Sequence, residues 1–232
     1  MEGKQMFSTE NYFGKYELVI RGEVGKELDD LKHLISQIEN RCTIRIMNID
    51  FHRPDKGSPI TVESLRGYNS DSRCKILAAL LYNDALWRLE AAHLMMCIGV
   101  LNVAYANLRA SVEFLQTAFI VERCDEQALR FLESKEVNLT LLEKLINPKY
   151  SKHLKDLKDT YTRLGVHRYL ESLQLCSLFG ASRFDKYVTE STKIQKSLQL
   201  PEGFIDAVKV SIQQGGQVGL LFSWLESIPV KS

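Results

Sequence analysis

The feature that constrains the fold most is a stretch of apolar residues at helical spacing that runs from residue 72 to residue 123. Its apolar side chains recur at steps of three and four residues, which places them along one face of an α-helix. Gly99 is the only residue in this stretch that commonly interrupts a helix. Because one helix of more than about 50 residues is unusual in a compact domain, the stretch predicts two helices, 72–96 and 100–123, joined near Gly99.

A second apolar pattern lies closer to the N-terminus. Its near-heptad spacing favours packing along another helix, within the bundle or between subunits, and its members are Ile20, Val24, Leu28, Leu31, Ile35, Ile38, Cys42, Ile46 and Ile49. We expect one long helix that begins at Tyr16 and ends before a loop at 52–59, which holds two prolines and a glycine. Residues 1–14 are predicted to be a flexible start, and residues 15–232 a single helical domain.

The rest of the chain also reads as helix. Further helices are predicted at 126–134, from Asn138 or Thr140 to 146, and at 151–164, 169–179, 185–198 and 201–227. Gly215, Gly216 and Gly219 interrupt the last of these and favour close packing or a kink, and its apolar end, 220–225, either docks on the bundle or contacts a partner. No series of strands with turn signals appears, so the sequence predicts an all-α, multi-helix bundle of seven to nine helices with a long N-terminal helix.

Composition narrows the classes of function. Thirty basic and 29 acidic residues give a net charge of +1, which argues against a protein that coats nucleic acid. The five cysteines are scattered and never at CxxC spacing, which is typical of free thiols in a reducing cytoplasm. The N-terminus has no apolar signal-peptide core, and no run is long enough to span a bilayer. We therefore expect a cytoplasmic protein with no membrane segment.

The familiar motifs of catalysis and metal binding are missing from the sequence. It contains no phosphate-binding loop, no HExxH, no paired-cysteine zinc site and no GxSxG elbow. Glu90 and His93 form a single ExxH, whereas a di-iron bundle needs a second copy on another helix. We expect no metal site and no cofactor.

Three polar residues stand out in the second helix of the central stretch. Tyr105, Arg109 and Glu113 are spaced by four, so they share one helix face. Because an isolated buried charge costs several kcal/mol, Arg109 and Glu113 must be paired or hydrated. One interpretation is an ion pair that fixes helix packing. The other is a site in which Tyr105, Arg109 and Glu113 bind an anion or a small polar ligand.

A second polar group, Tyr161 to Arg168, closes the charged helix 151–164. His167 follows Gly165 and is placed to cap the helix as a positive charge. Alternatively, Arg163 and His167 form a catalytic or recognition pair that faces a groove of the bundle.

Two segments carry a family resemblance. The run from Ala104 to Glu113 reads A-x3-L-R-x3-E and follows Gly99. It resembles a set of poorly characterised microbial helical proteins in which a Y-x2-L-S-x3-H segment comes later. Here Tyr161 to His167 is similar, although Gly165 replaces the serine and the spacing to the histidine is two residues shorter. The resemblance implies an α-helical bundle.

The run from Arg88 to His93 has the R-x4-H spacing of the HEPN superfamily and is similar to that motif. Members of this superfamily are helical bundles, often metal-independent ribonucleases of toxin or defence systems. The resemblance implies that His93 takes a proton from a ribose 2′-hydroxyl and that Arg88 stabilises charge on the phosphate. It also implies an RNA substrate and a homodimer that pairs two motifs in one cleft. Arg163 and His167, with only three residues between them, fall short of the spacing.

Three functions therefore remain as hypotheses. The first is a protein that acts through protein–protein contacts and forms a homodimer, since the stripe from Ile20 to Ile49 and the apolar end at 220–225 favour contacts between helices. The second is a HEPN-like ribonuclease that uses Arg88 and His93, or Arg163 and His167. The third is a bundle that binds a small polar ligand.

Overall fold

The computed structural model describes residues 9–47, 61–146, 148–166 and 203–227. Four helices in it are long: α1 (Thr9–Met47), α3 (Ser70–Cys97), α4 (Leu101–Arg123) and α9 (Phe204–Ser227). The shorter elements are α2 (Val62–Leu65), α5 (Asp125–Leu132), α6 (Leu141–Leu145), α7 (Pro148–Tyr161) and the π-helical turn η1 (Thr162–Val166). No strand occurs in these described segments, and the predicted all-α class is confirmed.

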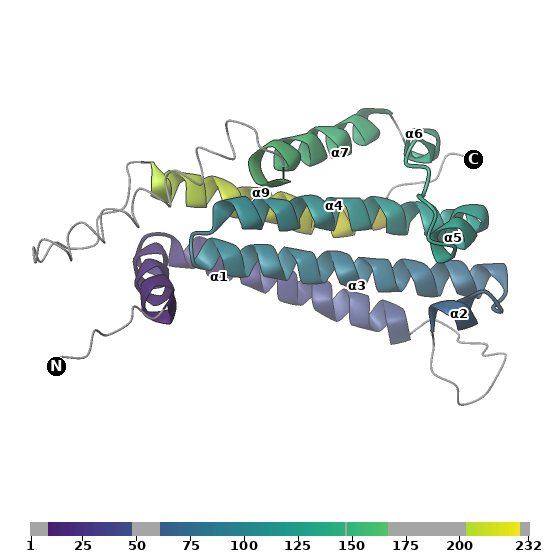
Figure 1. Ribbon diagram of the computed structural model, residues 1–232, viewed down its shortest axis with the longest axis horizontal. Helices are drawn as coiled ribbons and strands as arrows, with labels where there is room; N and C mark the ends of the chain where they lie inside the picture. The colour runs from purple at the N-terminus through teal and green to yellow at the C-terminus, as the bar shows by residue number, and fades with distance from the viewer. Residues whose placement is uncertain (1–8, 48–60, 147, 167–202, 228–232) are drawn as a thin grey trace, which may run out of the picture.

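The four long helices form one bundle. Figure 1 shows α3 and α4 side by side in front, with α1 and α9 behind them and α7 along the outer side of α4. Contacts join α1 to α3 and α9, and α4 to α3 and α9, while α7 and η1 pack on α4. The apolar faces of these helices meet in a single core, so the predicted bundle architecture is confirmed.

The predicted turn between the two central helices is also confirmed. Gly99 has φ +74°, in the left-handed region that disfavours residues with a Cβ atom. A Cβ atom built there would lie 2.7 Å from Cζ of Phe204 and 3.2 Å from Cδ1 of Ile20. Glycine is thus required twice: by the backbone of the turn, and by the close approach of α1 and the start of α9.

The apolar stripe of α1 packs inside the chain. Its residues are buried from Tyr16 through Ile38, so the stripe serves helix packing within the bundle. Two expectations about this helix need correction. It begins at Thr9, inside the segment predicted as a flexible start, and it bends at Val24, where φ is −137° and ψ is 23°.

The bend in α1 has a local cause. Gly22 and Gly25 flank Val24, and glycine lowers helix propensity by about 1 kcal/mol relative to alanine. Nη1 of Arg21, before the bend, lies 3.7 Å from Oδ1 of Asp29, beyond it. The periodicity of the stripe continues through the bend, so sequence spacing alone does not reveal it. Ile49, the last residue of the predicted stripe, lies outside the described residues.

The glycines of α9 allow close packing. The helix continues through Gly215, Gly216 and Gly219. A Cβ atom at Gly215 would lie 2.9 Å from Leu31, and one at Gly219 would lie 2.6 Å from Leu34, both on α1. The apolar end of the helix docks on the bundle through Leu221, Phe222 and Leu225.

Some predicted boundaries shift. The first helix of the central stretch, predicted from residue 72, begins at Ser70 and is capped by Asn69, whose side chain accepts from the Ser72 amide. α7 begins at Pro148, because proline is accommodated in the first turn of a helix. The helices predicted at 169–179 and 185–198 lie outside the described residues. Among the helices that are described, none is both long and apolar enough to cross a bilayer.

Candidate functional site

The structure separates Arg88 from His93. Both lie on α3, but five residues place two side chains about 140° apart around a helix. Arg88 is exposed on the outer face, whereas His93 is buried in the core. Within one copy of the chain, the two side chains therefore do not converge on a common site.

His93 has a specific structural partner. Its Nε2 atom lies 3.1 Å from the carbonyl oxygen of Leu28 on α1. Because a carbonyl oxygen only accepts, the ring nitrogen must carry the hydrogen and donate it. Sγ of Cys97 is 3.8 Å from the same nitrogen. Burial is the main cause that lowers the pKa of His93, which favours the neutral ring.

The predicted ion pair on α4 is present. Nε of Arg109 donates to Oε1 of Glu113 at 3.2 Å, and Nη2 lies 3.1 Å from the same oxygen. Lys158 of α7 brings its Nζ to 3.1 Å from this atom as well. Glu113 therefore holds two cations and ties α7 to α4, which is the packing role in the first interpretation of these residues.

The two tyrosines near this ion pair are buried. The ring of Tyr105 lies 6.1 Å from the ring of Tyr161, centroid to centroid. Burial raises the pKa of Tyr105 to about 12, and it also raises the pKa of Tyr161. The Tyr161 hydroxyl donates to Oε1 of Gln214 on α9 at 3.0 Å. Arg163 is exposed in η1, and His167 lies outside the described residues.

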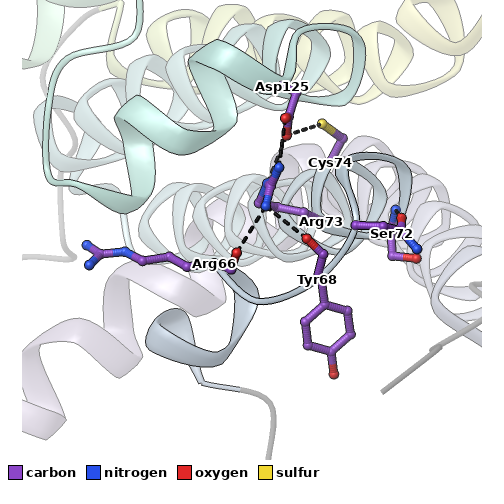
Figure 2. Close-up of polar contacts among 7 residues, drawn as sticks. Arg66, Tyr68, Ser72, Arg73, Cys74 and Asp125 are labelled. Carbon is purple, nitrogen blue, oxygen red and sulfur yellow. Dashed lines mark hydrogen bonds and ion pairs between the residues drawn. The ribbon is translucent and has the colours of Figure 1, made fainter. Parts of the chain in front are cut away.

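Sequence reasoning missed the most fully bonded polar cluster, which Figure 2 shows. Arg73, 7% exposed, donates from Nε and Nη2 to the two carboxylate oxygens of Asp125 at 2.8 and 2.7 Å. Its Nη1 donates to the carbonyl oxygens of Arg66 at 3.1 Å and Tyr68 at 2.9 Å. The guanidinium thus joins the start of α3 to the α2–α3 turn and to the first residue of α5.

Cys74 lies beside this cluster. Its Sγ is 3.6 Å from Oδ1 of Asp125. Burial first, and the neighbouring carboxylate second, raise the pKa of this thiol to about 11, so it stays protonated at neutral pH. Since every side chain here is engaged in holding helices together, the cluster is a structural clamp. Arg73 and Asp125 are 52 positions apart in the sequence, so residue spacing gave no signal for their contact.

Several of the exposed large apolar side chains of the bundle lie on the outside of α3 and α4. Leu80, Trp87 and Leu94 of α3 are 47, 67 and 60% exposed, and Val103 and Phe114 of α4 are partly exposed. A groove of about 350 Å³ between the helices is lined by Asp84, Trp87, Arg88, Ala91 and Phe114. We call these eight residues together the α3–α4 face.

The α3–α4 face had a sequence signal that was overlooked. Leu80, Trp87 and Leu94 are spaced by seven, which keeps them on one side of α3. However, α3 is apolar on most sides, and this spacing does not tell an outward row from a buried one. Only the packing of α1, α4 and α9 on the other sides of α3 decides it.

Among the residues that the structure describes, no group of three or more potential metal ligands comes together. Cys74, Cys97 and Cys124 form no disulfide; Cys74 and Cys97 are buried, and Cys124 is half-buried. Comparisons of the chain with protein-family models, with curated proteins and with solved structures found no match.

Proposed function

We propose that this chain is a cytoplasmic helical-bundle protein that acts through protein–protein contacts and self-associates through its α3–α4 face. The observation that carries the proposal is the row of Leu80, Trp87 and Leu94, three large apolar side chains left in water on one side of one helix. Exposed apolar side chains that gather on one surface mark interaction sites in soluble proteins. Tryptophan is also among the residues most enriched at the energetic centres of interfaces.

Two sequence features first favoured self-association: the apolar stripe of α1 and the apolar end of α9. In the structure, both make contacts within the chain. The stripe of α1 is buried against α3 and α9, and Leu221, Phe222 and Leu225 at the end of α9 are buried on the bundle. A partner would reach these buried side chains only by opening the fold. The α3–α4 face, by contrast, is accessible without any rearrangement.

The expected affinity follows from the size of these side chains. Complete burial of one leucine or aromatic side chain contributes about 1.5–3 kcal/mol. Two copies bring six such side chains, counting only the row on α3, and the loss of rotational and translational freedom offsets about 4–15 kcal/mol. The gain and the loss are of similar size, so we expect weak self-association that depends on concentration and is detectable at high micromolar concentration.

Sedimentation equilibrium of the full chain tests the proposal with two matched substitutions. Leu94 and Leu220 are 60 and 61% exposed, but Leu220 lies on α9, away from the α3–α4 face. Leu94→Ser should weaken self-association at least tenfold, and Leu220→Ser should leave it unchanged. A wild-type chain that stays monomeric at high micromolar concentration, or two variants that behave alike, would overturn the proposal.

A further inference from the structure

We infer that the second copy packs on the α3–α4 face with its α3 antiparallel to the first, and that the two-fold axis passes close to Trp87. This inference rests on the proposed self-association and specifies its geometry. In a two-fold interface the same patch contacts itself, so a residue on one side of the axis faces a residue on the other side. Leu80 and Leu94 each lie seven residues from Trp87. An axis at Trp87 therefore sets Leu80 of each copy against Leu94 of the other.

Charge favours the antiparallel arrangement. Asp84 and Arg88 lie one helical turn apart, both line the groove, and neither forms an ion pair with any other described residue. In an antiparallel pair the acidic residue of one copy approaches the basic residue of the other. In a parallel pair Asp84 would face Asp84 and Arg88 would face Arg88, which is unfavourable.

The groove beside Trp87 fits the same geometry. The small side chain of Ala91 leaves space between Trp87 on α3 and Phe114 on α4, about 350 Å³ in all. An axis near Trp87 brings the indole ring of the second copy to the mouth of this groove. Packing of an aromatic ring against two others in offset or edge-to-face contact contributes beyond simple burial.

The size of the two helices sets an upper bound on the interface. The 23 residues of α4 extend about 35 Å, and two adjacent helices are about 20 Å wide. Their outer side is therefore at most about 700 Å², and α7 and η1 cover part of it on α4. The interface is thus smaller than the roughly 800 Å² per partner of a standard interface, which fits weak self-association.

Cross-linking tests the direction of the two helices. Leu80→Cys and Leu94→Cys are made separately in a background in which Cys42, Cys124 and Cys176 are serine, and a short bis-maleimide is added. We expect covalent dimers when the two variants are mixed, and none from either variant alone. Dimers from Leu80→Cys alone would overturn the antiparallel arrangement, as would a mixture that does not react while sedimentation shows it to be dimeric.

Charge exchange tests the pairing of Asp84 with Arg88. Asp84→Arg and Arg88→Asp should each weaken dimerisation about tenfold, because each sets like charges against each other in both halves of the interface. The double variant Asp84→Arg/Arg88→Asp restores opposite charges and should return to within about threefold of the wild type. Single variants that dimerise normally, or a double variant no better than either, would contradict the pairing.

The two proposals fail in distinguishable ways. A monomeric wild type overturns the proposed function, and the inference with it. A dimer that Leu94→Ser weakens, but whose cross-links form only between identical positions, leaves the proposed function standing and overturns the antiparallel geometry alone.

Discussion

At the scale of single residues, polar side chains inside this bundle connect helices that are distant in sequence. His93 donates to a backbone carbonyl of α1, and Arg73 reaches both α5 and the α2–α3 turn. Both of these buried polar side chains have hydrogen-bond partners, as a low-dielectric interior requires. Their removal should therefore change stability, and the following two predictions measure this.

The first residue-scale prediction concerns pH. Burial is the main cause that lowers the pKa of His93 in the folded chain. The positive charges of Lys32 and Arg21 lower this pKa further, whereas the hydrogen bond to Leu28 and the charge of Asp29 raise it. The unfolded chain therefore takes up this proton near pH 6.5, while the folded chain does not. Stability that is present at pH 7 is then lost as the pH falls below about 6.5, with a slope of at most about 1.4 kcal/mol per pH unit.

Urea denaturation between pH 7 and pH 5 checks this dependence. The free energy of unfolding should fall less steeply in His93→Gln than in the wild type. His33→Gln, on the exposed side of α1, serves as the control and should follow the wild type. A His93→Gln variant with the full wild-type slope would show that this histidine is not the source.

The second residue-scale prediction concerns the clamp of Arg73. Asp125→Ala leaves the guanidinium buried without its carboxylate, and we expect a loss of about 2–3 kcal/mol in the free energy of unfolding. The control is Asp71→Ala, which removes an exposed pair with Lys75 and should change stability by less than about 0.5 kcal/mol. Chemical denaturation measures the free energy of unfolding of both variants. Equal losses would show that the buried ion pair contributes no more to stability than the exposed one.

At the scale of elements, the contact between α1 and α9 depends on where glycine occurs along α9. Gly215 and Gly219 face Leu31 and Leu34 of α1, where an added Cβ atom would lie under 3 Å away. Gly216, between them, has nothing within 4 Å of the position that a Cβ atom would take. Three glycines close together in sequence therefore have two different roles.

The prediction at this scale is a pair of opposite effects. Gly219→Ala should force Leu34 to move or the helices to separate, which destabilises by about 1–3 kcal/mol. Gly216→Ala should stabilise by about 0.5–1 kcal/mol, because alanine favours the helix and meets no neighbour. Thermal or chemical unfolding measures both, and two changes of the same sign would contradict the packing described for α9.

At the scale of the whole molecule, periodicity predicted the class of fold and the central hairpin. The apolar residues of α3 and α4 recur at helical spacing, and Gly99 is the only breaker between them, so the turn could be placed. The spacing of apolar residues does not indicate the direction of a helix axis, so it did not predict the bend at Val24. The ion pair of Arg109 and Glu113 was predictable because its two residues are neighbours on one helix.

Other polar contacts of the bundle could not be predicted in this way. The Arg73–Asp125 clamp and the addition of Lys158 to Glu113 join different helices, and only the packed fold brings these residues together. The same limit applies to the α3–α4 face, whose outward row resembles the buried rows of α3 in composition. Sequence spacing identified His93 as a catalytic candidate. In the fold, α1 passes beside His93, and the Leu28 carbonyl of α1 accepts its hydrogen bond. Sequence spacing could not predict this contact between two helices.

The packing of α1 against α9 also affects how the chain emerges from the ribosome. The apolar stripe of α1 packs partly against α9, a helix that is synthesised long after it. At roughly 5–20 residues per second, synthesis of the intervening segments takes on the order of 10 s. For that interval one side of α1 is exposed to water and to other nascent chains. The bundle must therefore keep that side of α1 from aggregating until α9 has been synthesised.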